Sequence, residues 1–66
     1  MEKKTFETYG YGKVTLEETG DVGRFGDKEF EMTAEDGGSY GYIYSDSINS
    51  VTDEDVEAQI EENLYY

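Results

Sequence analysis

Residues 29–45 read EFEMTAEDGGSYGYIYS, and this stretch decides the fold. Apolar and polar side chains alternate on both sides of a glycine-rich turn, which predicts a β-hairpin of strands 29–35 and 39–45. The two-residue loop is either Asp36-Gly37 or Gly37-Gly38, and both registers sort the side chains onto the same two faces. The better candidate for the core is the face that carries Phe30, Met32, Ala34, Gly41 and Ile43. The other face carries Glu31, Thr33, Glu35, Tyr40, Tyr42 and Tyr44.

Two earlier alternating runs, residues 4–9 and 13–19, predict another hairpin. A three-residue loop, Gly10-Tyr11-Gly12, keeps the apolar residues of both runs on one face, whereas a two-residue loop separates them. Because register follows the buried face, we expect the three-residue loop with a glycine bulge. The register that this loop predicts pairs Phe6 with Leu16 and Thr8 with Val14.

Glycines punctuate the segment between the two hairpins. Gly20-Asp21 predicts a turn, a short strand Val22–Phe25 follows it, and Gly26-Asp27 closes that strand. The meander over residues 4–45 is therefore expected to contain four or five strands.

Residues 53–64, DEDVEAQIEENL, predict a helix. Thr52 is a good N-cap, and Asp55 occupies the N3 position of a capping box. Val51 and Val56 are placed to form a hydrophobic staple across this start. The sequence therefore predicts a well-defined N-terminus for the helix.

An apolar stripe at every fourth position lets this helix pack on the sheet, and its members are Val56, Ile60 and Leu64. Ile48, in the connecting loop 46–52, is expected to fill the junction. The sequence thus predicts one α+β domain over residues 1–66, a small antiparallel β-meander of four to five strands with one C-terminal α-helix packed on one face. High charge and low mean hydropathy would favour disorder, but the regular patterning argues against it.

The charge of the chain is distributed very unevenly. Residues 1–28 contain six acidic and five basic residues, whereas residues 29–66 contain eleven acidic residues and no basic one. The net charge of −12 therefore falls almost wholly on the second part of the chain. Adaptation to high salt is a weaker explanation, because Glu outnumbers Asp and Lys outnumbers Arg.

Composition argues against several classes of function. Direct nucleic-acid binding requires Lys or Arg to neutralise phosphates. A strongly negative chain is expected to be repelled by nucleic acid and by anionic membrane surfaces alike. Without Cys or His we expect no disulfide, no metal site and no cofactor, and no catalytic constellation indicates an enzyme. The N-terminal sequence lacks the apolar run of a signal peptide, which favours a cytoplasmic protein. Homodimerisation stays open.

The predicted helix has an unusual charge pattern. Asp53 and Glu57, and likewise Glu57 and Glu61, are like-charge pairs four residues apart, each costing about 0.2–0.5 kcal/mol. Glu61 and Glu62 lie near the negative end of the helix dipole, where cations are favoured. Six acids within residues 53–62 span about 15 Å, a charge density in the range of duplex DNA. Local rules broken without compensation often mark functional sites.

The alternating tyrosines of strand 39–45 allow two interpretations. Aromatic side chains suit the pleated surface of a sheet, and tyrosine is also enriched where proteins bind one another. Beside glutamates, a row of tyrosines suits a basic, Arg-rich partner. The expected partner-binding residues are Glu31, Glu35, Asp36, Tyr40, Tyr42, Tyr44, Asp53, Glu54, Glu57, Glu61 and Glu62.

These features lead to two hypotheses of function. The first is an acidic nucleic-acid mimic that binds the basic nucleic-acid-binding groove of a host protein. Such an inhibitor suits phage-type counter-defence in the host cytoplasm, with anti-CRISPR, anti-restriction or anti-repair activity. The alternative is a non-mimic interaction module, a small subunit or adaptor that docks through its Tyr-rich sheet face or an edge strand.

Overall fold

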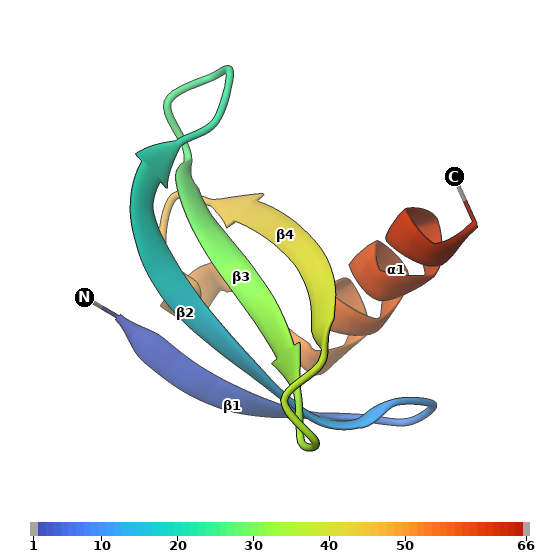
Figure 1. Ribbon diagram of the computed structural model, residues 1–66. Coiled ribbons are helices and arrows are strands. Elements are labelled where there is room, and N and C mark those ends of the chain that lie inside the picture. The colour runs from blue at the N-terminus through green and yellow to red at the C-terminus, as the bar shows by residue number, and fades with distance from the viewer. Residues whose placement is uncertain (1, 66) are drawn as a thin grey trace.

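Four antiparallel strands follow one another across the sheet in chain order, and one helix covers one face (Figure 1). The computed structural model describes residues 2–65. Its elements are β1 (Lys3–Thr8), β2 (Gly12–Val22), β3 (Lys28–Ala34), β4 (Ser39–Ser45), a short 3-10 turn η1 (Ile48–Ser50) and α1 (Asp53–Leu64). The predicted α+β class is confirmed, with four strands rather than five. Within residues 2–65 no helix has the length and apolar character needed to cross a membrane.

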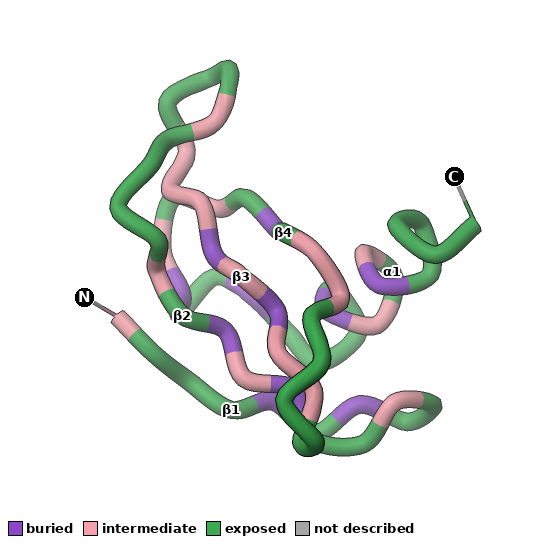
Figure 2. The backbone as a smooth tube through the Cα atoms, in the orientation of Figure 1, coloured by how far each residue is buried: buried purple, intermediate pink, exposed green. Residues whose placement is uncertain are grey.

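The core lies between the sheet and α1, because alternate residues of each strand point to the helix side. The most completely enclosed side chains are Val14, Leu16, Phe30, Met32, Val56 and Ile60. Phe6, Ile43, Ile48 and Val51 complete the buried cluster, so Ile48 fills the junction before α1 as expected. Figure 2 shows the buried positions recurring along the strands and on α1.

The β1–β2 register differs from the expected one by two residues. The observed pairs include Phe6 with Val14 and Thr8 with Gly12, not Phe6 with Leu16 and Thr8 with Val14. The Thr8 hydroxyl fixes the earlier turn, since it donates to the Gly12 carbonyl at 2.8 Å and accepts from the Tyr11 amide at 3.0 Å. Gly12, with φ of 70°, then begins β2. A shift of two residues leaves each side chain on its predicted face.

The strand β2 continues through the predicted turn at Gly20-Asp21 to Val22, and the predicted separate strand Val22–Phe25 is wrong. A β-bulge absorbs these residues, with Gly20 at φ 95°. The Thr19 hydroxyl accepts from the Asp21 amide at 3.2 Å and so stabilises the bulge. The loop to β3 is formed instead by residues 23–27, which project from one end of the sheet (Figure 1).

A second bulge displaces one residue of β4 near the β3–β4 turn. The pairs on either side of it are Met32 with Gly41 and Thr33 with Ser39. Tyr40 is the extra residue, so the alternation of faces is broken there. Its ring packs against the core and meets the ring of Tyr11 edge to face, with centroids 5.6 Å apart. The prediction that Tyr40 shares a face with Tyr42 and Tyr44 is therefore wrong.

Both ends of α1 are as predicted, but its apolar stripe is shorter than expected. The Thr52 hydroxyl accepts from the Asp55 amide, and the Asp55 carboxylate accepts from the Thr52 amide, both at 3.1 Å. These reciprocal bonds form the capping box. The apolar stripe stops at Ile60, because Leu64 is 54% exposed. Asn63 faces β4 in place of Leu64 and binds its backbone.

Candidate partner-binding surfaces

The face of the sheet away from α1 is not covered by any described element, and we call it the open face. Glu31 lies directly opposite Tyr42 on it, and Glu29 lies opposite Tyr44. Tyr42 and Tyr44 are 45% and 48% exposed. The mixed glutamate and tyrosine surface that the sequence predicts is therefore accessible to a partner, with Tyr42 and Tyr44 but without Tyr40.

Glu29 organises the end of the open face next to the β2–β3 loop. Its carboxylate accepts hydrogen bonds from the Thr19 hydroxyl at 2.7 Å and from the Tyr44 hydroxyl at 2.8 Å. The bond to Glu29 is the main cause that raises the pKa of Tyr44, and desolvation adds to it. The hydrogen bond thus holds the Tyr44 ring in place and disfavours loss of its proton.

The outer side of α1 carries carboxylates without countercharge. Glu54, Glu57 and Glu61 line one shallow hollow of about 210 Å³ around Ala58. Among residues 2–65, the ion pair between Lys28 and Glu2 is the one salt bridge, and it lies far along the chain from α1. No group of three carboxylates in the described part of the chain converges closely enough to hold a metal ion.

Two of the helix acids also have structural partners. Asp55 belongs to the capping box, and the Glu57 carboxylate accepts from the backbone amide of Tyr9 at 3.1 Å. This second bond ties α1 to the tip of the β1–β2 hairpin. Burial raises the pKa of Tyr11 at that tip, and the carboxylates of Glu61 and Glu57 raise it further. Asp53, Glu54, Glu61 and Glu62 are exposed.

The structure divides the predicted site residues into separate groups. The acids of α1 lie on the helix side of the sheet, whereas Glu31, Tyr42 and Tyr44 lie on the open face. Glu35 and Asp36 lie at the β3–β4 turn, where the Asp36 carboxylate accepts from the Gly38 amide at 3.0 Å. The acidic helix and the Tyr-bearing face are therefore two surfaces, which approach one another along the outer edge of β4.

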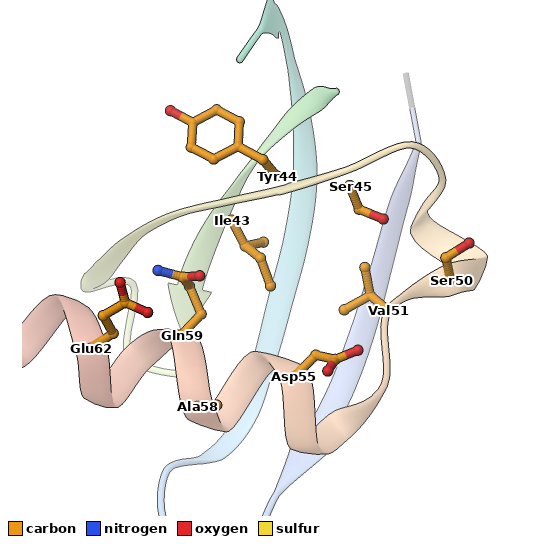
Figure 3. A pocket seen from close by; sticks show the side chains of 9 residues that line it. All are labelled: Ile43, Tyr44, Ser45, Ser50, Val51, Asp55, Ala58, Gln59 and Glu62. Atoms are coloured by element: carbon orange, nitrogen blue, oxygen red, sulfur yellow. The ribbon is translucent and has the colours of Figure 1, made fainter. Parts of the chain in front are cut away.

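A groove runs between β4 and α1 along that edge. Figure 3 shows Ile43 pointing toward the helix and Tyr44 pointing away from it, with Gln59 and Glu62 rising from α1 to face the strand. The hollow in this view has a volume of about 310 Å³. Gln59 and Asn63 were not among the predicted site residues, although their spacing of four residues beside the apolar stripe marks a flank that faces the sheet.

The exposed tip of the β2–β3 loop was not predicted from the sequence either. Phe25 in this loop is 86% exposed and Val22, the last residue of β2, is 68% exposed; within the loop the Gly23 amide donates to the Asp27 carbonyl at 2.7 Å. The Tyr44 ring supports this loop so closely that a Cβ at Gly23 would lie 2.8 Å from it. The tip therefore presents two apolar side chains from a well-defined backbone.

No protein-family model matches the chain, and no curated protein or solved structure shows significant similarity to it.

Proposed function

We propose that this protein is an acidic inhibitor that occupies the basic nucleic-acid-binding groove of another protein. The observation that carries the proposal is the outer side of α1, where Glu54, Glu57 and Glu61 gather around one hollow and form no ion pair with the described residues. A solvated helix face is more stable when both signs of charge alternate on it. Uncompensated carboxylates are instead suited to a partner that supplies the positive charge.

The spacing of the charges supports nucleic-acid mimicry in particular. Glu54, Glu57 and Glu61 rise along the axis by about 4.5 Å and then about 6 Å. A strand of duplex DNA carries one phosphate per about 3.4 Å of axis, so a groove that binds phosphates offers cations at comparable intervals. Interception of a CRISPR effector, a restriction enzyme or a DNA-repair enzyme in phage counter-defence is the biological setting we propose.

Competition with DNA tests this proposal. Binding of the chain to a panel of purified proteins, one from each of those three classes, is measured with and without duplex DNA. We expect at least one of them to bind, with DNA as a competitive ligand and with affinity that falls steeply as salt rises. Simultaneous binding of DNA and this chain, or no binding across the panel, contradicts the proposal.

A matched pair of variants separates the helix acids from overall charge. Glu54→Gln, Glu57→Gln and Glu61→Gln together remove three charges from α1, while the amide oxygen of the new side chain at position 57 can still accept from the Tyr9 amide. The control removes three exposed charges elsewhere, by Glu7→Gln, Glu17→Gln and Asp21→Asn. We expect the first set to lower the affinity and the salt dependence much more than the second.

A second candidate is an adaptor that docks through the open face. It is favoured by the exposure of Tyr42 and Tyr44 on a face that no described element covers. In that case Tyr42→Ala abolishes partner binding, whereas neutralisation of the α1 acids has little effect.

A further inference from the structure

The outer edge of β4 has no neighbouring strand among residues 2–65, because the sheet order is β1-β2-β3-β4. The carbonyl of Tyr42 points to this side, since it accepts from the side-chain amide of Asn63 at 3.4 Å. In an antiparallel strand the amide and carbonyl of one residue point the same way, and so do those two residues on. The amide of Tyr42 and both backbone groups of Tyr44 therefore face outward, in the direction from which an added strand would pair with them.

Asn63 already occupies the first part of this edge. Its amide nitrogen donates to the carbonyls of Tyr40 at 3.1 Å and Tyr42 at 3.4 Å, as the amides of a neighbouring strand would. Asn63 therefore covers the edge as far as the Tyr42 carbonyl, and the open part, with both backbone groups of Tyr44, runs from there to Ser45. This length is enough to pair with a short extended segment but not with a long strand.

Three hollows share Tyr44 and border this open edge on both sides. Two lie toward α1, with volumes of about 310 and 470 Å³, and both reach Gln59 and Glu62. The third, also of about 470 Å³, lies toward the β2–β3 loop and is lined by Val22 and Phe25 together with Arg24 and Asp27. The side chains of an added strand would alternate between these two sides.

The chemistry of the two sides differs, which identifies the occupant. On the helix side Glu62 is exposed, and the described residues that form the walls include no Lys or Arg. On the loop side Phe25 and Val22 present apolar surface, and the positive charge of Arg24 in the lining disfavours a second cation there. We propose that the edge of β4 binds an extended segment of a basic protein, with Lys or Arg side chains toward α1 and apolar side chains toward the β2–β3 loop. This inference does not depend on the proposed mimicry, because it concerns another surface and a peptide tests it.

A second copy of the chain suits this edge poorly. Pairing of two β4 edges would bring together two molecules with a net charge of −12 each, and would place Glu62 of one copy near the acidic groove of the other. Like charges at this distance oppose association unless high salt screens them. A basic partner relieves the same repulsion.

The probe is a short synthetic peptide that alternates Val with Lys or Arg and has both ends blocked. Binding is followed by NMR amide shifts and hydrogen exchange of the full chain. We expect the peptide to shift the amide signals of Tyr42 and Tyr44 and to protect the Tyr44 amide from exchange. A control peptide with the same side chains, N-methylated on the backbone that faces β4, cannot donate these hydrogen bonds and is expected to lose the protection.

Two charge variants locate the binding on the molecule. Glu62→Lys reverses a charge on the groove and is expected to weaken peptide binding by at least about threefold. Glu54→Lys makes the same change on the outer side of α1, away from the groove, and is expected to have a smaller effect. Both residues are exposed, so both variants should fold.

Three results would overturn the inference. The first is an absence of binding at about 1 mM peptide, the weak limit of useful affinity. The second is equal binding of the N-methylated peptide, or shifts confined to the outer side of α1, since either indicates simple charge attraction. The third is protection of the Tyr44 amide that depends on protein concentration without peptide, which assigns the edge to a second copy. A failed DNA competition with successful peptide binding refutes the mimicry alone.

Discussion

The backbone of Gly41 lies so close to the side chain of Asn63 that a Cβ at position 41 would require Asn63 to move. A Cβ at Gly41 would lie 2.8 Å from the Asn63 amide nitrogen, and Gly41 has a φ of 100°. Gly41→Ala therefore adds backbone strain to a steric conflict. We expect it to lower the free energy of unfolding by about 1–3 kcal/mol, measured by urea denaturation.

Gly37→Ala is the matched control for that substitution. Gly37 has a similar φ of 96°, but no described atom outside its chain neighbours lies within 4 Å of a Cβ built on it. The difference between the two variants measures the contact with Asn63 rather than the strain. Equal losses of stability would mean that Asn63 moves aside freely.

Reversal of one charge on α1 should stabilise the free protein. Glu61→Lys replaces a like-charge pair with Glu57 by an attractive one and puts a cation in the last turn, where there is none. We expect the free energy of unfolding to rise by about 0.5–1 kcal/mol at low salt. Glu61→Gln should give a smaller gain, and a thermal melt at low and high salt measures both.

The same variant connects stability to function. If the α1 acids bind a basic groove, Glu61→Lys weakens partner binding while it stabilises the free chain. If Glu61→Lys is stabilised but binds a DNA-competing partner with unchanged affinity, the interface lies elsewhere.

The capping box predicts a local loss of stability. Thr52→Ala removes the acceptor for the Asp55 amide and should cost about 0.5–2 kcal/mol. Ser50→Ala, two residues earlier at an exposed position, is the control and should change little. Urea denaturation followed by circular dichroism provides the comparison, and equal effects would show that the cap contributes nothing.

The contact between Tyr44 and Glu29 predicts alkaline sensitivity. The folded-state pKa of Tyr44 is raised above its ordinary value, so the unfolded chain loses this proton first. The stabilisation is therefore complete below about pH 10, the ordinary tyrosine pKa, and declines as pH rises through the folded-state value. Tyr44→Phe should show a weaker loss of stability as pH rises above about 10, measured by urea midpoints, and an unchanged pH profile would contradict the assignment.

Regular patterning made most of the fold predictable. Alternation placed Phe30, Met32 and Ile43 correctly in the core, and the TxxD signature located the start of α1 at the right residue. The register error in the first hairpin arose because two three-residue loops give the same faces. The hydroxyl of Thr8, whose bonds depend on backbone geometry, selects between them.

The two β-bulges at glycine positions could not be predicted from the alternation of apolar and polar residues. Gly20 and Gly41 resemble ordinary turn or strand residues in sequence, but their positive φ angles mark bulges. One bulge lengthens β2, and the other turns Tyr40 toward the core. The candidate surfaces were only partly predictable. The position of Tyr40 depends on the bulge, and the groove beside Tyr44 depends on where α1 packs against β4.

The bond between Glu57 and the Tyr9 amide also bears on how the chain folds. The strands of the meander pair with their neighbours in sequence, so each hairpin closes only a short loop, whereas this bond joins residues 48 positions apart. Contacts of such long range form late in folding because the entropy of closing the chain opposes them. The acidic helix should accordingly dock last, onto a sheet that is already paired. Charge repulsion on α1 should then raise the rate of unfolding and have little effect on the rate at which the sheet forms.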